Sequence, residues 1–325
     1  MKTTAIIAAL LLTVMFSSPL RFLKPSKVQP QQIEPTAAQT PVFAETKPSN
    51  LQFYDSFKVL LDGQIHTLSA DEYTMGVLAA EMPLSYSEEA LKAQAVAAYT
   101  FACHRRLQNS SAEYDITADS ETDQAFIPIE NAKSKWGDNT DRYLDKLQKV
   151  IDDTKGLMLT YNNAPALSVY HAISPGVTVD CEDVWGDKIP YLVSVDSAGD
   201  MLCEDFISSA CFSPQELLSA LGTSGDTSLA DQWFQSIDTA SSGKVRSVKF
   251  CDKSFSGGDV AKALGLRSSN FTVNFDGQAF TFTVKGYGHG VGMSQTGAEY
   301  MAQQGADFKE ILAHYYPACT LETKK

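Results

Sequence analysis

Glu81 stands where a carboxylate is badly placed for stability but well placed for acid–base chemistry. It is the last residue of the apolar run YTMGVLAAE, and Met82-Pro83 follow it. Because the residue before a proline is pushed out of the helical conformation, a helix over this run must stop at Glu81. The C-terminal end of a helix carries partial negative charge, which disfavours an anion. The sequence leaves two interpretations open: a surface carboxylate at a frayed helix end, or a carboxyl group kept protonated so that it can donate a proton.

The glycine-rich stretch VKGYGHGVGMSQTG is a second candidate site. His289 lies inside four alternating glycines, Gly286, Gly288, Gly290 and Gly292. Such a loop can bring backbone N–H groups close to a ligand at the start of a helix, where anions and polar groups bind. The spacing is not G-x-G-x-x-G, so a dinucleotide site is disfavoured. His289 has a functional and a structural interpretation of equal weight, and Ser294 is expected to cap the following helix.

The stretch VYHAISPGVTVDCEDVWGDKIPYL offers His171 at a strand end, before a turn at Ser174-Pro175-Gly176. These side chains could line a cleft, or they could form a polar loop closed by Trp185. A metal site of His171 with Cys181 and Cys203 has no supporting spacing. A serine or cysteine nucleophile lacks a signature such as G-x-S-x-G. The acidic residues of ITADSETDQAF, which are Asp119, Glu121 and Asp123, are more typical of a solvated loop than of a catalytic pair.

The six cysteines are widely spaced, and no C-x-x-C pair occurs among them. A zinc cluster is therefore not indicated. In an oxidising compartment Cys203 and Cys211 could form a local disulfide, and buried free thiols are the alternative.

Net charge argues against nucleic acid as a partner. The chain of 325 residues has a formal charge of −13. Residues 1–50 carry five basic and two acidic residues, a charge of +3, so −13 less +3 leaves about −16 on the remainder. Nucleic-acid binding depends on Lys and Arg that neutralise phosphates, and so acidic a domain is poorly suited to it.

The N-terminal region predicts a membrane attachment. It starts with Lys2 and has no charge from Thr3 to Leu20, and it lacks a clear cleavage site. This pattern favours an uncleaved signal-anchor over residues 1–23. The proline-rich residues 24–50 predict a linker. We therefore expect a single-pass protein of the cell membrane whose domain, residues 51–321, is extracytoplasmic.

The domain is expected to be α+β, with helices and antiparallel strands around one cleft. Residues 51–68 predict a hairpin over Asp62-Gly63. Ser69 and Glu72 form a capping-box pattern before the helix that ends at Glu81, and Ser85 with Glu88 predicts a second one before a central helix to about Leu107. Further strands are expected over 156–172, 244–251 and 271–285. Two closing helices run from Ser294 to about Gln304 and from Asp307 to Tyr316.

Four blocks of the sequence together resemble the stage II sporulation protein D family, which is related to the amidase enhancers of cell-wall turnover. They are AAEMPLSYSEEALKAQAVAAYTFA, DSETDQAF, YHAISPGVTVDCEDVWGDKIPYL and GYGHGVGMSQTGAEYMAQQGADFKEILAHYYP, in the family's order. The resemblance covers nearly all of residues 51–320. It implies a lytic transglycosylase that cleaves peptidoglycan glycan strands lacking stem peptides, during engulfment in sporulation. The implied partners are the stage II sporulation proteins P, an amidase, and M.

By motif position, the resemblance implies that Glu81 is the catalytic acid/base. The positions that match the family's substrate-binding cleft are Tyr99, Gln124, His171, Ser174, His289, Ser294 and Gln295. Three departures stand out. Tyr99 occupies a position that is often arginine, the turn at Ser174-Pro175-Gly176 replaces Ser-x-Gly-Gly, and a zinc-binding Cys…His-Cys run of some members is absent. We expect neither a metal nor an organic cofactor.

Three functions remain open from the sequence. A lytic transglycosylase needs only one carboxyl group, because the muramic acid's own C6 hydroxyl attacks and closes a 1,6-anhydro ring. A hydrolase would need a second carboxylate, such as Asp119 or Glu121, and water as acceptor. A non-catalytic protein that binds the wall or activates an amidase is the third possibility.

Overall fold

The structure is a computed structural model that describes residues 51–324. The predicted anchor (1–23) and linker (24–50) lie outside the described residues. Within 51–324, no helix is both long enough and apolar enough to cross a membrane. The fold mixes helices with mainly antiparallel strands, so the α+β class is confirmed.

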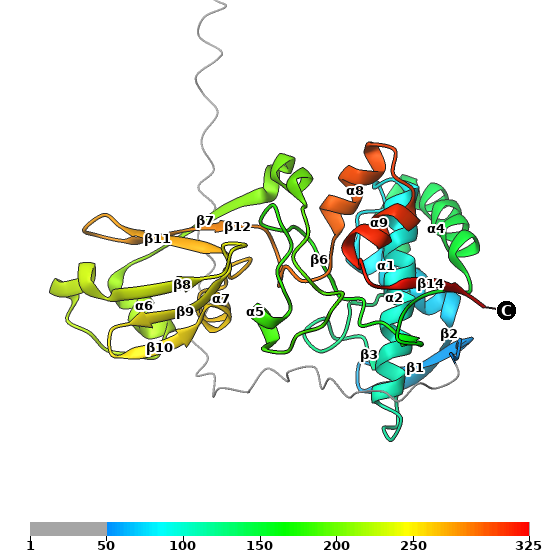
Figure 1. The fold of residues 1–325 in the computed structure, drawn as a ribbon, viewed down its shortest axis with the longest axis horizontal. Coiled ribbons are helices and arrows are strands. Elements are labelled where there is room, and N and C mark those ends of the chain that lie inside the picture. The colour runs from blue at the N-terminus through cyan, green and yellow to red at the C-terminus, as the bar shows by residue number, and fades with distance from the viewer. Residues whose placement is uncertain (1–50, 325) are drawn as a thin grey trace, which may run out of the picture. The chain divides into compact units, whose positions relative to one another are not determined.

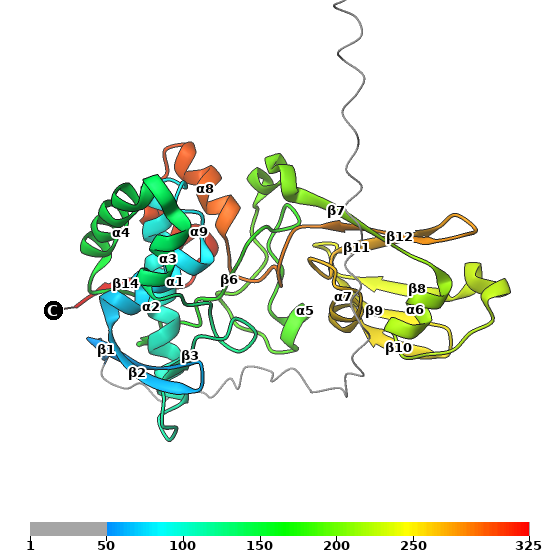
Figure 2. The same cartoon turned by 180° about the vertical axis from the view of Figure 1, so that it is seen from behind.

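A first hydrophobic core is built around one long helix, α2 (Glu88–Gln108), which contacts helices on several sides (Figures 1 and 2). Its apolar residues are buried over most of its length, as expected for a central helix. The other helices of this core are α1 (Ala70–Glu81), α3 (Ile129–Trp136), α4 (Thr140–Thr154), α8 (Gln295–Gln303) and α9 (Phe308–Tyr315). Both closing helices are confirmed, with Ser294 and Asp307 as their N-caps.

Three small sheets border this core. The first has the order β2-β1-β3 and the second β14-β4-β5, while β6 and β13 pair in parallel. The strands are β1 (Ser56–Leu61), β2 (Gln64–Ser69), β3 (Ile116–Thr117), β4 (Leu157–Tyr161), β5 (Ala164–Pro165), β6 (Tyr170–His171), β13 (Met293–Ser294) and β14 (Thr320–Thr323). The hairpin over Asp62-Gly63 is confirmed, and both turn residues have positive φ, as a type I′ turn requires.

A second hydrophobic core lies between residues 207 and 285 and is rich in phenylalanine, with Trp233 stacked on Phe280. Two three-stranded sheets form it, with orders β10-β9-β8 and β11-β12-β7. Its elements are β7 (Ile207–Phe212), α6 (Pro214–Ala220), β8 (Phe234–Thr239), β9 (Val245–Phe250), β10 (Lys253–Ser256), α7 (Gly257–Leu264), β11 (Phe271–Phe275) and β12 (Phe280–Lys285). The sequence predicted β9 and the β11–β12 hairpin but not that they belong to a core of their own.

Short helices connect the two groups of strands and helices: α5 (Glu182–Trp185), η2 (Ala198–Leu202) and η3 (Glu204–Phe206), with η1 (Gly137–Asn139) and η4 (Thr227–Gln232) elsewhere. Arg246 on β9 forms an ion pair with Asp183 of α5 at 2.6 Å, and Gly286 donates a backbone hydrogen bond to Phe206. These contacts join the second core to residues 182–206, which follow the candidate site residues His171 and Ser174 in the chain.

The end of α1 is as the sequence predicts. Ser69 caps its start by accepting a hydrogen bond from the Glu72 N–H at 3.1 Å. The helix stops at Glu81, and Met82 is extended with φ −131° and ψ 138° because Pro83 follows.

The predicted capping box at Ser85 is wrong. Helix α2 begins three residues later, at Glu88, with Ser87 as its N-cap and no side-chain cap. The Ser87 N–H is instead bound by the Glu299 carboxylate at 2.6 Å. A carboxylate from α8 thus replaces the local cap, which a local sequence pattern cannot reveal.

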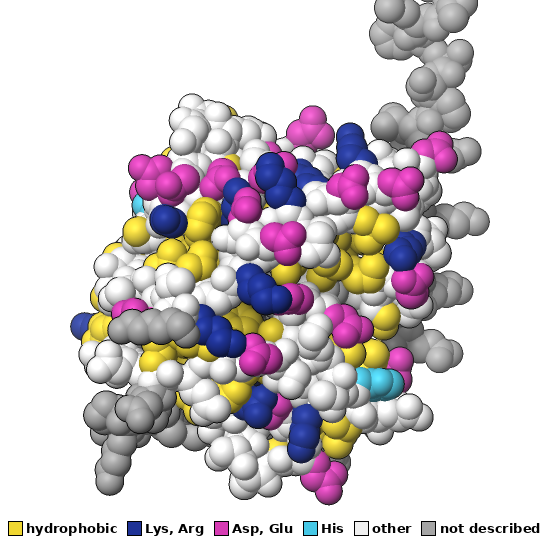
Figure 3. Space-filling view, turned by 90° about the vertical axis from the view of Figure 1, so that its right-hand side faces the viewer, with side chains coloured by type: hydrophobic (Ala, Val, Ile, Leu, Met, Phe, Trp, Pro, Cys, Tyr) yellow, Lys and Arg dark blue, Asp and Glu magenta, His cyan; other side chains and the backbone are white. Residues whose placement is uncertain are grey.

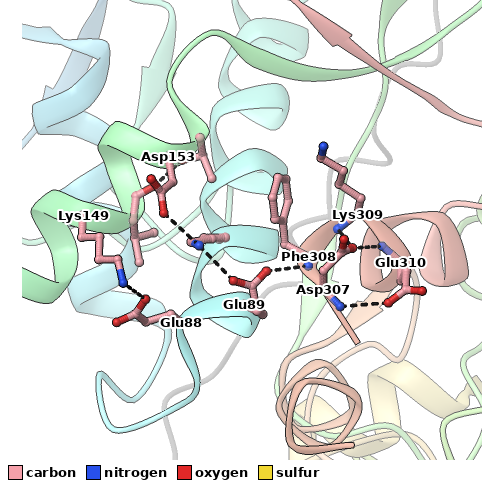
Figure 4. A network of polar contacts seen from close by, with 11 residues as sticks. Glu88, Glu89, Lys149, Asp153, Asp307, Phe308, Lys309 and Glu310 are labelled. Carbon is pink, nitrogen blue, oxygen red and sulfur yellow. Dashed lines mark hydrogen bonds and ion pairs between the residues drawn. The ribbon is translucent and has the colours of Figure 1, made fainter. Parts of the chain in front are cut away.

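Polar contacts fix the first turn of α2 to its neighbours (Figure 4). Glu89 accepts a hydrogen bond from the Phe308 N–H at 2.9 Å, and Lys92 bridges Glu89 and Asp153 at 2.9 and 2.8 Å. Because α9 and α4 hold this turn, the segment 82–87 that follows Glu81 is anchored at its far end.

The six cysteines are free thiols in the structure, so the pairing of Cys203 with Cys211 is not formed. On the face shown in Figure 3, Lys and Arg side chains lie among Asp and Glu side chains. This face therefore offers no broad basic surface of the kind that binds nucleic acid.

Candidate active site

The Glu81 carboxyl is half-buried at the C-terminal end of α1. Its Oε1 accepts a hydrogen bond from the Ala125 N–H at 2.6 Å, and the Tyr170 hydroxyl also contacts it. Burial raises the pKa of Glu81 above its ordinary value, and these two contacts oppose the increase without cancelling it. A carboxyl group that stays protonated at higher pH and retains access to solvent is suited to donate a proton.

Gln124 organises the polar groups next to Glu81. Its Nε2 donates to the Tyr73 hydroxyl at 2.9 Å and to the Ala98 carbonyl at 3.1 Å, and its Oε1 accepts from the Tyr170 hydroxyl at 2.7 Å. The predicted residues Glu81 and Gln124 are therefore brought together by the structure, on neighbouring sides of Tyr170. Tyr73 and Tyr170 were not predicted as site residues.

A glycine lets the segment after Gln124 approach helix α1. A Cβ added at Gly76 would lie 2.3 Å from the Phe126 ring and 2.7 Å from the Ile127 carbonyl oxygen. The Ile127 N–H donates to the Gly76 carbonyl, and Phe126 stacks on Tyr73. Only glycine leaves room for this contact, which sets the Ala125 N–H against Glu81.

Tyr170 and His171 are consecutive on β6, and their side chains point to opposite sides, as in any strand. Tyr170 reaches Glu81 and Gln124, whereas His171 faces the glycine-rich loop, with Nδ1 3.0 Å from the Val291 carbonyl. Burial and the neighbouring His289 lower the pKa of His171 to about 3, so its ring is neutral. Since a carbonyl only accepts, Nδ1 carries the proton, and the buried Nε2 is an acceptor without a partner among the described residues.

His289 is held by backbone on both sides. Its Nδ1 accepts from the Val291 N–H at 3.0 Å, and the ring also hydrogen-bonds the Tyr170 backbone. Burial lowers its pKa to about 4, and its ring lies 5.4 Å from that of Trp185 between centroids. These contacts favour the structural interpretation of His289.

The glycine-rich loop packs closely against the protein, and several of its N–H groups are occupied there. A Cβ at Gly292, where φ is 70°, would lie 2.1 Å from the Val169 carbonyl oxygen. The N–H groups of Gly286, Tyr287, Gly288 and Met293 all donate to protein carbonyls. The glycines are thus required by close packing against residues 169–179, and these four N–H groups are not available to a ligand.

Ser174 and Ser294 meet at Asp200, a residue that sequence reasoning missed. Asp200 accepts from the Ser174 N–H at 2.9 Å, the Ser197 hydroxyl at 3.0 Å and the Ser294 hydroxyl at 2.9 Å. Ser294 also caps α8 by accepting from the Gly297 N–H at 3.2 Å, as predicted. Burial raises the pKa of Asp200. The two serine side chains are occupied within the protein.

Two buried amides have unpartnered atoms. Gln94 on α2 contacts the Tyr170 side chain, but neither of its amide atoms forms a hydrogen bond of normal geometry within the described residues. Gln295, a predicted residue, starts α8, and its Nε2 has no partner in the same part of the chain. Gln94 could have been noticed in the sequence as the single amide in the apolar run AQAVAA.

Tyr99 is not part of the group around Glu81. Its hydroxyl accepts from the Tyr54 N–H at 2.9 Å and donates to the Tyr54 carbonyl at 3.1 Å. It lines a cavity of about 340 Å³ with Ser69 and Asp71, at the start of α1. Glu81 ends the same helix, about 16 Å away along its axis. Tyr99 therefore contacts Tyr54, just before β1, rather than the Glu81 carboxyl.

The acidic loop remains a solvated turn in the structure. Asp119 accepts hydrogen bonds from the Glu121 N–H and the Thr122 hydroxyl, and it is exposed, as is Glu121. Asp123 forms an ion pair with Arg105 and accepts from the Thr117 N–H. Within residues 51–324, no group of three or more His, Cys, Asp and Glu side chains is arranged to hold a metal ion.

The geometry thus outlines a candidate site for general acid–base chemistry around one carboxyl group whose pKa is raised by burial. A family model described as "Stage II sporulation protein" matches residues 62–161, which include Glu81 and Gln124. The chain is 36% identical over 257 residues to stage II sporulation protein D of Bacillus amyloliquefaciens, covering 78% of this chain and 74% of that protein. It is 34% identical over 256 residues to the protein of that name from Bacillus subtilis (strain 168), with the same coverage.

The chain belongs to the stage II sporulation protein D family. A more distant relative is the amidase enhancer of Bacillus subtilis (strain 168), 27% identical over 298 residues that cover 76% of this chain and 40% of that protein.

Proposed function

We propose that this protein is a lytic transglycosylase that cleaves peptidoglycan glycan strands between N-acetylmuramic acid and N-acetylglucosamine, with Glu81 as its acid/base. The observation that carries the proposal is the Glu81 carboxyl group: half-buried, with a raised pKa, and oriented by the Ala125 N–H at 2.6 Å. Protonated Glu81 donates to the glycosidic oxygen. The resulting carboxylate then takes the proton of the C6 hydroxyl, whose oxygen closes the 1,6-anhydro ring.

A single carboxyl group favours this reaction over hydrolysis. Glycoside hydrolases usually use two carboxyl groups that flank the scissile bond. Here Asp119 is occupied within its own exposed turn, and Asp123 is neutralised by Arg105. An acceptor hydroxyl supplied by the substrate itself removes the need for a second carboxylate.

Substrate binding rests on hydrogen bonds rather than on charge. The domain is acidic, so it does not attract an anionic wall electrostatically. Neutral polar side chains are therefore expected to bind the hydroxyl and N-acetyl groups of a glycan, whereas the unpartnered atoms of Gln94, Gln295 and His171 are buried and do not face solvent. Strands without stem peptides are the expected substrate.

Family membership supports a role in the engulfment step of sporulation. The corresponding partners are the stage II sporulation proteins P, an amidase, and M. The charge and apolar pattern of residues 1–23 supports a single-pass attachment to the cell membrane with the domain extracytoplasmic. Membrane fractionation of the full chain, followed by protease treatment of intact cells, tests this placement: protection of the domain from the protease would refute it.

A non-catalytic function in wall binding or amidase activation is the second candidate, favoured by the likeness to an amidase enhancer. Incubating the protein with glycan strands from which an amidase has removed the stem peptides separates the candidates. Mass spectrometry of the products is expected to find 1,6-anhydro-muramyl ends. Reducing ends would indicate a hydrolase, and no cleavage would leave the binding or activating function. Full formation of anhydro products by Glu81→Gln would refute the role of Glu81.

A further inference from the structure

A cavity of about 570 Å³ lies beside the segment that follows Glu81. One wall is formed by Leu84, Ser85 and the start of α2, and the other wall is helix α4. Leu84 is three residues from Glu81, so their Cα atoms are at most about 11 Å apart. Spacings of four and three residues put the basic side chains of α4 that line the cavity on one face of that helix. They are Arg142, Lys146 and Lys149.

Hydrogen bonds hold the wall opposite α4 in place. The Lys146 ammonium donates to the carbonyl of Leu84 at 3.0 Å and to the carbonyl of Tyr86. The Glu299 carboxylate of α8 accepts from the Ser87 N–H at 2.6 Å. Because two helices hold the segment between α1 and α2, a ligand meets a cavity that is already formed, and this lowers the cost of binding.

The lining of the cavity has a surplus of positive charge. Lys149 and Glu88 form an ion pair at 2.5 Å and neutralise each other (Figure 4). Among the described residues, neither Arg142 nor Lys146 has a carboxylate in ion-pair contact, and Asp145 is the one other acidic residue of the lining. Lys146 is engaged by backbone carbonyls, so the exposed Arg142 guanidinium has free donors and keeps its charge at neutral pH.

The substrate proposed above offers an anion that fits this charge. In N-acetylmuramic acid the stem peptide is joined to the lactyl group of the sugar through an amide bond. An amidase that removes the peptide hydrolyses this bond and leaves a carboxylate on the sugar. A strand without stem peptides therefore carries a carboxylate on every second sugar, whereas a peptide-bearing strand carries a neutral amide at the same place.

We propose that the cavity between α4 and the start of α2 binds the lactyl carboxylate of a muramic acid near the scissile bond, with Arg142 as its main donor. This inference rests on the proposed function and adds the group by which strands without stem peptides are selected. A guanidinium donates two parallel, charge-assisted hydrogen bonds to a carboxylate, and such bonds are about twice as strong as those to a neutral amide.

This contact adds one local charge interaction to the hydrogen bonds expected elsewhere in the site. The domain as a whole is acidic, but salt at physiological ionic strength screens exposed charges that are more than about 8 Å apart. A carboxylate inside the cavity is therefore affected mainly by the side chains that line it, where three basic and two acidic residues leave one positive charge.

The test measures binding in the Glu81→Gln background, so that no strand is cleaved. The probes are amidase-treated glycan strands and the same strands with their carboxyl groups converted to methylamides. Arg142→Gln is expected to weaken binding of the carboxylate strands about fivefold, as for a good ion pair at an exposed position, and to leave binding of the methylamide strands unchanged. Lys262→Gln removes one positive charge from an exposed position of α7 and is the control, with both probes bound normally.

Four results would overturn the inference: unchanged binding of the carboxylate strands in Arg142→Gln, an equal loss with the methylamide strands, an equal loss in Lys262→Gln, or binding of neither probe. Cleavage by the unmodified protein together with any of them would refute this inference alone. The expected binding pattern without cleavage would refute the lytic function and keep the carboxylate site. Where cleavage is measured, Arg142→Gln is expected to raise KM about fivefold for the carboxylate strands and to leave kcat unchanged.

Discussion

Glu81 and Asp200 are both carboxylic acids whose pKa is raised by burial, but the protein surrounds them differently. Asp200 has no exposed surface and accepts hydrogen bonds from an N–H and two serine hydroxyls. Glu81 is half-buried, with one N–H donor and a contact to the Tyr170 hydroxyl. The number of donors, rather than burial alone, therefore separates a structural carboxyl group from one that is free to react.

The environment of Asp200 explains what its carboxyl group does. It joins the turn at Ser174, the helix η2 and the start of α8, and Ser197 extends the contact to the Tyr315 hydroxyl at 2.8 Å. These segments flank β6 and β13, and β6 carries Tyr170. Asp200 thus supports the site from a distance, whereas Glu81 is available to a substrate.

The largest difference between the two carboxyl groups is expected in catalysis. Glu81→Gln keeps the shape of the side chain but cannot transfer a proton, so formation of anhydro-muramyl ends should fall by about 10³-fold. Circular dichroism should show unchanged folding. Glu72→Gln, the same change at an exposed position of the same helix, is the control and should retain full activity. A loss in Glu72→Gln as large as in Glu81→Gln would contradict the special role of Glu81.

The reverse pattern is expected at Asp200. Asp200→Ala leaves the buried Ser197 and Ser294 hydroxyls and the Ser174 N–H without their acceptor, and the free energy of unfolding should fall by about 3 kcal/mol. Asp205→Ala is the control, because that side chain is 74% exposed and forms only a surface ion pair with Arg267, which is worth about 0–1 kcal/mol. Urea denaturation measures both. Equal losses in the two variants would show that the Asp200 contacts do not stabilise the fold.

The sequence predicted the features that depend on local physics. Pro83 ends α1 at Glu81, Ser294 caps α8, and Asp62-Gly63 closes the first hairpin. Each of these is set by residues within one or two turns of the chain. Where the cap came from far away, as from Glu299 to the start of α2, the local pattern at Ser85 was misleading.

The site was predictable only in part for the same reason. Glu81 showed its misfit with the helix dipole in the sequence itself, but its partner Tyr170 is 89 positions away and is chosen by the pairing of β6 with β13. The sequence block that begins YHAISPG drew attention to His171. Because side chains alternate along a strand, the neighbouring Tyr170 contacts Glu81 instead. Asp200 carries no local signal, since its donors come from residues 174, 197 and 294.

A smaller effect is expected at Gly76, where a substitution tests whether the close contact of helix α1 with residues 126–127 positions the Ala125 N–H. In Gly76→Ala the new methyl group would overlap Phe126 and the Ile127 carbonyl, so the segment that carries Ala125 must shift. We expect a loss of about 2 kcal/mol in stability and a reduced rate of cleavage. Gly258→Ala in α7 is the control, because the nearest atom to its Cβ is 3.7 Å away. A Gly76→Ala variant as stable and active as Gly258→Ala would show that this close contact does not position the site.

The smallest effect concerns the pH dependence of stability. Because the pKa of Glu81 is raised in the folded protein, its contribution to stability is present below the pKa of the unfolded chain and is lost as pH rises through the folded value. Glutamine does not titrate, so Glu81→Gln should gain stability over the unmodified protein across this range. Each unit of raised pKa corresponds to about 1.4 kcal/mol, and partial exposure reduces the gain to about 1 kcal/mol. Denaturation of both proteins between acid and mildly alkaline pH measures it, with Glu72→Gln expected to show no such gain. If Glu81→Gln instead lost stability relative to the unmodified protein as pH rises, the fold would be stabilising the Glu81 anion. Glu81 would then resemble a structural carboxylate more than Asp200 does.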